Sequence, residues 1–152
     1  MNNLFVIYGL IPEKTAKLAK LIADRNDLYF LSVNDLIEYE FSKVVFDYEN
    51  CHNDYFQSKV DKLVKSVFEY ENSVIFIDVD TLINENVLEV SKLKSNLIFI
   101  NYNNSGFVPV VNNIVFDEIQ SECLQHADLV VDESHENDMI KQIEDYLHKK
   151  IS

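Results

Sequence analysis

Glycine and positive charge are scarce in this sequence of 152 residues. It contains two glycines, Gly9 and Gly106, and a single arginine, Arg25. Enzymes that transfer phosphoryl groups use glycine-rich backbone to approach phosphates, and arginine or lysine to stabilise the charge of the transferred group. With 13 basic and 26 acidic residues, the formal net charge is −13. This balance argues against binding to nucleic acid, whose phosphates attract clustered basic residues.

Paired cysteines and a membrane-spanning run are missing as well. Cys51 and Cys123 stand outside any CxxC spacing, which favours ordinary thiols in a reducing cytosol. The first apolar run, from Leu4 to Ile11, lacks a basic leader and a small-residue cleavage site, and Pro12 cuts it short. Such a run predicts neither a signal peptide nor a membrane span. We therefore expect a cytoplasmic protein that does not engage a membrane.

Apolar and aromatic residues, by contrast, are plentiful. Hydrophobic residues make up 47% of the chain and aromatic residues 12%, which predicts a folded protein in spite of the charge. The length is near that of a typical domain, so we expect one domain over residues 1–152. The acidic surface is typical of a soluble protein, and a basic protein partner or mimicry of nucleic acid is the alternative interpretation.

Five short, nearly continuous apolar runs predict the strands of a parallel sheet that is buried on both faces. The runs are Leu4–Tyr8, Leu28–Leu31, Val74–Ile77, Leu97–Ile100 and Leu129–Val131. Helical patterns separate them, such as the apolar residues at offsets of three and four between Asp54 and Tyr70, and a shorter helix from Ala16 to Ala23. This alternation predicts a three-layer α/β fold with a five-stranded sheet, whose ligands bind beyond the carboxyl ends of the strands.

A phosphate-binding loop is nearly present after the first of these runs. In the pattern G-x-x-x-x-G-K-[ST], backbone N–H groups cradle phosphates, the lysine reaches them and the hydroxyl holds magnesium. The segment keeps Gly9 and the pair Lys14-Thr15, which are candidates for a residual phosphate site. It is one residue short, Glu13 replaces the second glycine, and Pro12 removes a backbone donor.

Glu13 makes the electrostatics of this loop adverse for a nucleotide. A carboxylate ~4 Å from a phosphate charge costs about 4 kcal/mol at an effective dielectric of ~20, comparable to a thousandfold in affinity. The simpler interpretation is that Pro12 and Glu13 open a helix, with the proline in its first turn and the acid at its positive end. We favour that interpretation.

Together with the residues that follow, this start resembles the shikimate kinase family, and the resemblance covers most of the chain. In that family the second strand ends in Asp-x-Asp-x-x-Ile-Glu, which matches the stretch from Ser32 to Glu38. The resemblance implies a P-loop kinase-like fold. It also implies that Ser32 replaces a magnesium-linked aspartate and that Asn34 replaces the aspartate that binds the shikimate hydroxyls.

Other functional residues of the family are also replaced in this sequence. The Phe-Arg pair that binds the shikimate carboxylate in the family matches Phe56-Gln57, so a neutral amide stands in place of the guanidinium. A Gly-Gly-Gly turn of the family matches Asp78-Val79-Asp80, whose carboxylates would repel an anionic substrate. The arginine-bearing lid corresponds to a reduced stretch from Asn103 to Asn113. A signature before the C-terminus matches Cys123 to Asp132, with Ser121 in place of the expected arginine.

Three further groups of residues have alternative interpretations. Asp78, beside Thr15, is a candidate magnesium ligand, although acids at a strand end commonly cap the next helix or face water. Cys123, His126 and Asp128 have ligand-like spacing, but they fall on a helix and the strand after it, so we expect no zinc site. Aromatic residues crowd one region, where packing is the simplest explanation and exposure would mark a protein contact surface. They are Tyr39, Phe41, Phe46, Tyr48, Tyr55 and Phe56.

The sequence leaves three hypotheses for function. The first is a catalytically inactive shikimate-kinase-like protein, a pseudoenzyme, that binds a protein partner or small ligand and uses no cofactor. The second is a weakly active kinase that binds ATP and magnesium through Lys14, Thr15 and Asp78, with Asn34 and Gln57 left from its substrate site. The third is a structural or vestigial product. We favour the first, because scaffold positions match the family while charged working positions are replaced.

Overall fold

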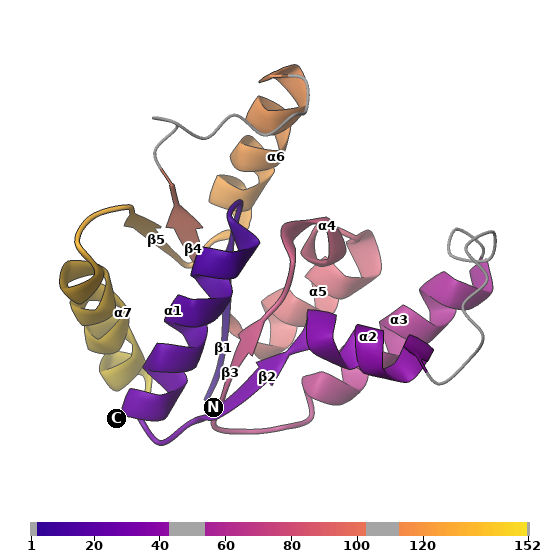
Figure 1. Ribbon diagram of the computed structural model, residues 1–152, viewed down its shortest axis with the longest axis horizontal. Coiled ribbons are helices and arrows are strands. Elements are labelled where there is room, and N and C mark those ends of the chain that lie inside the picture. The colour runs from indigo at the N-terminus through magenta and orange to yellow at the C-terminus, as the bar shows by residue number, and fades with distance from the viewer. Residues whose placement is uncertain (1–2, 43–53, 103–112, 152) are drawn as a thin grey trace.

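The computed structural model describes residues 3–42, 54–102 and 113–151, and at residues 41–42, 54–57 and 113–117 it describes the backbone alone (Figure 1). Its five strands pair in parallel, in the order β2-β3-β1-β4-β5. They are β1 (Leu4–Gly9), β2 (Tyr29–Ser32), β3 (Ser73–Phe76), β4 (Asn96–Asn101) and β5 (Leu129–Asp132). Each lies within one residue of its predicted run. The predicted five-stranded parallel sheet is confirmed.

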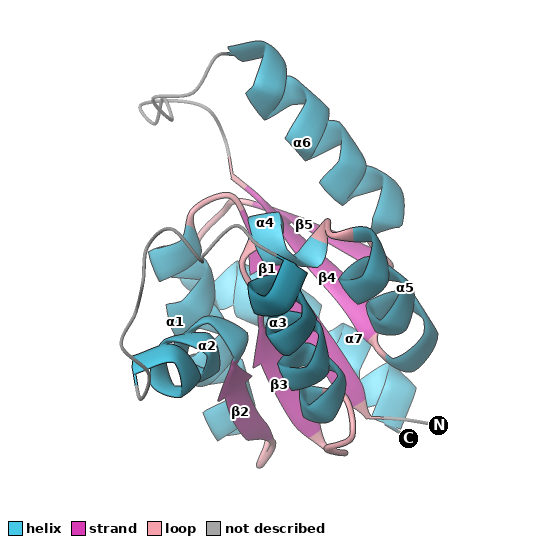
Figure 2. Ribbon diagram, turned by 90° about the vertical axis from the view of Figure 1, so that its right-hand side faces the viewer, coloured by secondary structure: helices cyan, strands magenta, loops and turns pink. Residues whose placement is uncertain are grey.

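Helices cover both faces of this sheet, as Figures 1 and 2 show from two directions. One face is covered by α1 (Pro12–Arg25) and α7 (Glu136–Ile151). The opposite face packs against the helices α2 (Val33–Ser42), α3 (Asp54–Val67), α4 (Val79–Leu82), α5 (Glu85–Lys94) and α6 (Asn113–His126). The three-layer α/β arrangement predicted from the sequence is therefore confirmed. Within the described parts of the chain, no helix is both long and apolar enough to span a membrane.

The core lies on the two sides of β1, the middle strand. Leu4, Val6 and Tyr8 face the layer that contains α3 and α5, whereas Phe5 and Ile7 face α1 and α7. All five side chains are fully buried, and burying a side chain of the Val, Leu, Ile or Phe type contributes about 1.5–3 kcal/mol. Because successive side chains of a strand point to opposite faces, a continuous apolar run suits a strand covered on both sides.

Helix α1 carries the chain from the tip of β1 back along the sheet. Pro12 occupies its first turn and Glu13 is the acid of that turn, so the prediction that these two residues open a helix is confirmed. The helix is longer than the predicted stretch from Ala16 to Ala23, because a fixed φ makes proline compatible with the first turn. It ends at Arg25, and Asp27 then adopts a positive φ of 53°.

Helix α3 ends earlier than its apolar pattern predicts. The pattern runs from Asp54 to Tyr70, but the helix stops at Val67 and continues only as turns. Phe68 is nevertheless buried in the same core as Val64. The apolar periodicity therefore marks which residues are buried, and it overstates the length of the regular helix by three residues. Asn72, at φ 57°, then redirects the chain into β3.

Candidate functional site

The tip of β1 and the start of α1 meet at Gly9. A side chain at this position would begin 2.8 Å from Thr15 Oγ1, 2.8 Å from Tyr102 Cε2 and 3.0 Å from the Ile100 carbonyl oxygen. Those separations leave no room for a Cβ atom, which explains why glycine stands here. The glycine therefore allows a close approach between parts of the protein itself, namely α1, β4 and the residue that follows β4.

Thr15 is fully buried at this junction, and its hydroxyl group is occupied. Oγ1 donates to the carbonyl oxygen of Ile11 at 2.7 Å, and it lies 2.8 Å from the hydroxyl group of Tyr102. Because Thr15 has one hydroxyl proton, the Tyr102 hydroxyl must be the donor in the second bond. The backbone N–H of Thr15 also donates to Ile11, at 3.0 Å. The groups of Thr15 that would hold magnesium and phosphate thus have partners within the protein.

Tyr102 also belongs to this junction, although the sequence did not predict a role for it. It lies just beyond β4 and is 9% exposed, and burial raises the pKa of its hydroxyl above the ordinary value. It reaches Thr15 because Gly9 pairs with Ile100 across β1 and β4. The only indication in the sequence is an aromatic residue directly after a predicted strand. That indication points to Thr15 only once the pairing of β1 with β4 is known.

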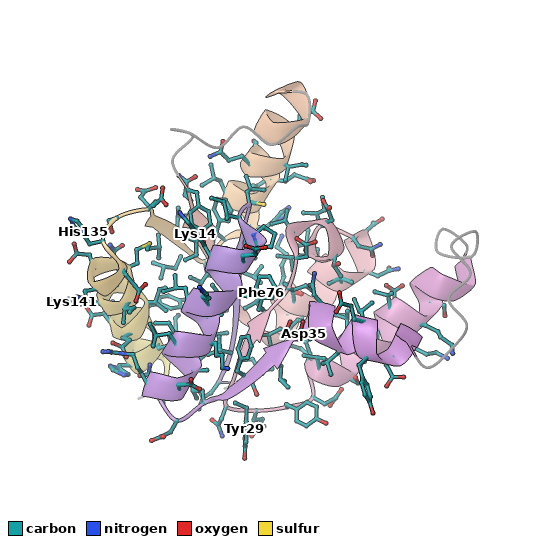
Figure 3. The ribbon with its side chains drawn as sticks, in the orientation of Figure 1. Lys14, Tyr29, Asp35, Phe76, His135 and Lys141 are labelled. Atoms are coloured by element: carbon teal, nitrogen blue, oxygen red, sulfur yellow. The ribbon has the colours of Figure 1, made fainter. Side chains whose placement is uncertain are left out.

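Lys14 sits at the start of α1 (Figure 3) and forms an ion pair on the protein surface. Its Nζ lies 3.6 Å from Oε2 of Glu133, and its side chain is 64% exposed. Glu133 follows β5, so the pair joins the start of α1 to the loop before α7. Of the predicted phosphate site, Gly9 and Thr15 contact each other in the interior while Lys14 lies on the surface.

Asn34 and Asp78 form a second contact, at the carboxyl ends of β2 and β3. Asn34 Oδ1 accepts a hydrogen bond from the backbone N–H of Asp78 at 3.1 Å. Burial raises the pKa of the Asp78 carboxyl, and the charge of Asp80 raises it further, whereas the Val79 N–H and the Asn34 side chain lower it. Asp78 occupies the N-cap position of α4 but makes no capping hydrogen bond through its side chain.

The remaining predicted residues fall into two groups. Ser32 accepts a hydrogen bond from the backbone N–H of Asp35 at 3.3 Å, so it helps to start α2. The side chain of Gln57 and the stretch matched to the lid, apart from Asn113, lie outside the described residues. The same holds for Cys51 and for the crowded aromatic side chains other than Tyr39, which is 60% exposed.

Cys123, His126 and Asp128, for which no zinc site was expected, belong to no group of three potential metal ligands within the described ranges. Cys123 is buried on α6, and its surroundings raise the pKa of the thiol to about 12 through burial and the charge of Glu122. Its carbonyl oxygen accepts a hydrogen bond from the Tyr8 hydroxyl at 2.9 Å. Cys123 is thus a packed, unreactive thiol.

Two cavities open near these groups. The larger, of about 490 Å³, lies between α1 and the start of α7. Its lining residues are Lys14, Lys17, Leu18, Leu21, Tyr102, Glu133, Ser134, Glu136 and Met139. The smaller, of about 310 Å³, lies between α2, α3 and α4. Its lining residues are Asn34, Ile37, Glu38, Val60, Asp80, Thr81 and Asn84.

Comparison with solved structures identifies the fold, although no protein-family model and no curated protein sequence matches the chain. Shikimate kinase from Aquifex aeolicus gives a TM-score of 0.78 at 19% identity, over 97% of this chain and 98% of that one. Shikimate kinase from Bacteroides thetaiotaomicron gives 0.74 at 15% identity, over 95% and 98%. Dephospho-CoA kinase from Campylobacter jejuni gives 0.56 at 12%, over 99% and 100%. The chain therefore has the α/β fold of shikimate kinases and other P-loop kinases.

Proposed function

We propose that this protein is a pseudoenzyme, a kinase-like fold that binds a small ligand or a protein partner without transferring phosphate. The observation that carries the proposal is the buried contact between Thr15 and Tyr102, whose hydroxyl oxygens lie 2.8 Å apart. In a working phosphate-binding loop the hydroxyl of this residue holds magnesium. Here it is fully buried and bonded to two protein groups.

The composition of the loop supports the same proposal. Pro12 lacks a backbone donor, and Glu13 places a negative charge at the start of α1. Lys14, the remaining cation of the motif, is paired with Glu133. Binding a nucleotide would require separating that pair, exposing Thr15 and accommodating an unfavourable carboxylate. We therefore expect the protein to use neither ATP nor magnesium.

Calorimetric titration with ATP and magnesium tests the proposal directly. We expect no binding, or binding only at millimolar concentrations, and no phosphorylation of shikimate in a coupled assay. The shikimate kinase of Aquifex aeolicus, which shares the fold, serves as the positive control. Micromolar binding of the nucleotide, or turnover of shikimate, would overturn the proposal.

A residual kinase is the second candidate, and the exposed position of Lys14 at the start of α1 favours it. In that case Lys14 contacts phosphate, and Thr15 and Asp78 hold magnesium. Lys14→Met would then abolish a measurable affinity for ATP, whereas Lys20→Met, an exposed lysine on the same helix, would leave it unchanged. Equal effects of the two substitutions would exclude a phosphate site at Lys14.

The proposal also covers the location of the protein in the cell and the class of partner that it does not bind. We infer a cytoplasmic location, without nucleic acid as a partner, from the net charge of −13 and from two cysteines that stand outside any CxxC spacing. Fractionation of the source cells followed by crosslinking would test this. Recovery of the protein with nucleic acid would contradict the placement.

A further inference from the structure

The smaller cavity, between α2, α3 and α4, has the size and mixed lining of a small-molecule site. Its volume of about 310 Å³ is at the lower end of the range for ligand pockets, which is roughly 300–1,000 Å³. Ile37 and Val60 provide apolar surface, and Val60 is itself buried. Asn34, Thr81 and Asn84 provide amide and hydroxyl groups. A ring about as large as a monosaccharide fits these dimensions.

The polar groups of the cavity are held in place by the protein. Asn34 is fixed through its hydrogen bond with the backbone N–H of Asp78, and Asn84 Oδ1 accepts a bond from the backbone N–H of Asn86 at 3.1 Å. The Asn84 amide group and the Thr81 hydroxyl remain as donors, since neither has a partner among the described residues. Preorganised groups of this kind lose little freedom when a hydroxylated ligand binds.

Both charged residues that line the cavity are acidic. Glu38 contributes a carboxylate from α2 and Asp80 contributes one from α4, and none of the described lining residues is basic. Within the described parts of the chain, neither carboxylate has an ion-pair or hydrogen-bond partner. Asp80 is also close enough to Asp78 to raise the pKa of that carboxyl. An anion would be repelled from this cavity, and a cation would be attracted by the two carboxylates that line it.

We propose that this cavity binds a small, hydroxylated organic cation. Its ammonium group lies at the carboxylates of Glu38 and Asp80, and its hydroxyl groups bond to Thr81 and Asn84. Its ring packs on Ile37 and Val60. The proposal rests on the proposed function, because it names the class of ligand that a non-catalytic protein of this fold would hold. An organic cation is preferred to a metal ion, because no group of three suitable ligands occurs among the described residues.

Three sugars of similar size and different charge provide the test. Glucosamine carries an ammonium group at mildly acidic pH, glucose is neutral and glucuronate is anionic. Each is titrated into isotope-labelled protein at low salt while the backbone amide signals of Asn34, Thr81 and Asn84 are followed. We expect glucosamine to shift these signals and to bind roughly tenfold more tightly than glucose. Glucuronate should bind more weakly than either.

Two double variants of equal charge locate the effect. Glu38→Gln with Asp80→Asn should remove the preference for glucosamine, whereas Glu40→Gln with Glu89→Gln should retain it. All four residues are exposed, so both variants should fold, and their spectra report this directly. Absence of a preference in the native protein would overturn the proposal. So would a preference that survives loss of Glu38 and Asp80, because it would then reflect the overall charge alone.

The same sample separates this proposal from the proposed function. After the first titration, ATP and magnesium are added and phosphorus NMR is used to look for a new phosphomonoester. Its appearance would overturn the proposed lack of catalysis while leaving the ligand class intact. Binding of glucosamine without any such signal supports both proposals.

Discussion

A small buried unit joins the tip of β1 to α1, and a few close atomic contacts determine its structure. It consists of Gly9, Thr15 and Tyr102. Gly9 permits the approach of the other two side chains, and the Tyr102 hydroxyl donates to Thr15 Oγ1, which itself donates to the Ile11 carbonyl oxygen. Groups of this kind are sensitive to substitution, because a buried polar atom without a partner costs about 1–3 kcal/mol.

Gly9→Ala should destabilise the protein by about 1–3 kcal/mol, because the added methyl group overpacks the site. The neighbouring side chains can adjust, but the Ile100 carbonyl oxygen belongs to the backbone of β4 and lies 3.0 Å from the new atom. The free energy of unfolding in urea measures the effect. Lys20→Ala, an exposed change on α1, should alter it by about 0.5 kcal/mol or less. Equal stability of Gly9→Ala and the native protein would contradict the described packing.

A double-mutant cycle tests the bond between Thr15 and Tyr102. Thr15→Val removes the acceptor and leaves the buried Tyr102 hydroxyl unpaired, so we expect a loss of about 1–3 kcal/mol. Tyr102→Phe leaves Thr15 bonded to Ile11 and should cost about 1 kcal/mol. The double variant should be more stable than the sum of the single losses implies, with a coupling of about 0.5–3 kcal/mol. Additive losses would show that the two hydroxyl groups do not interact.

At the scale of secondary-structure elements, α1 and α7 are joined by the only arginine of the chain. Arg25 Nη2 donates to Glu144 Oε1 at 3.0 Å, and Arg25 Nε donates to Oε2 at 3.3 Å. Asn26 donates to the same carboxylate at 2.9 Å, and its Oδ1 lies 2.9 Å from His148 Nε2. The guanidinium group, which kinases use on phosphate, here connects two helices at the amino-terminal edge of the sheet.

The stability that Glu144 provides should depend on pH. The hydrogen bond from Arg25 is the main cause that holds the pKa of this carboxyl below its ordinary value. A carboxyl with a lowered pKa in the folded state stabilises the protein above its ordinary pKa, and this stabilisation is lost as the pH falls through the folded value. Glu144→Gln should therefore unfold more easily at neutral pH and match the native protein in strong acid. Asp145→Asn, an exposed change on α7, should show no such trend.

The positions of the strands along the chain could be predicted from the sequence. Which strands lie next to each other in the sheet could not. Continuous apolar runs arise because both faces of the sheet are covered, so each run marks a strand without reference to the rest of the chain. The order β2-β3-β1-β4-β5 depends on which helix crosses which face, and that is a property of the whole fold. The role of Tyr102 depends on this order, because its hydroxyl group bonds to Thr15, a residue 87 positions away in the sequence.

For the molecule as a whole, the net charge of −13 should make stability depend on salt. Like charges repel each other more when the chain is compact, and salt screens this over about 30 Å at 0.01 M but about 8 Å at 0.15 M. We expect the thermal unfolding temperature to rise between these conditions. The variant with Glu40→Gln and Glu89→Gln, at a net charge of −11, should show a smaller rise. A decrease with salt would mean that local ion pairs outweigh the general repulsion.

The central place of β1 also has a consequence for how the chain is made. Its partners in the sheet are residues 73–76 on one side and 96–100 on the other. A ribosome that adds roughly 5–20 residues per second therefore releases this apolar strand seconds before either neighbour exists. Until β3 emerges, residues 4–9 have no sheet to join. During that interval the apolar side chains of residues 4–9 stay unburied, and transiently exposed apolar surface of this kind is prone to aggregation.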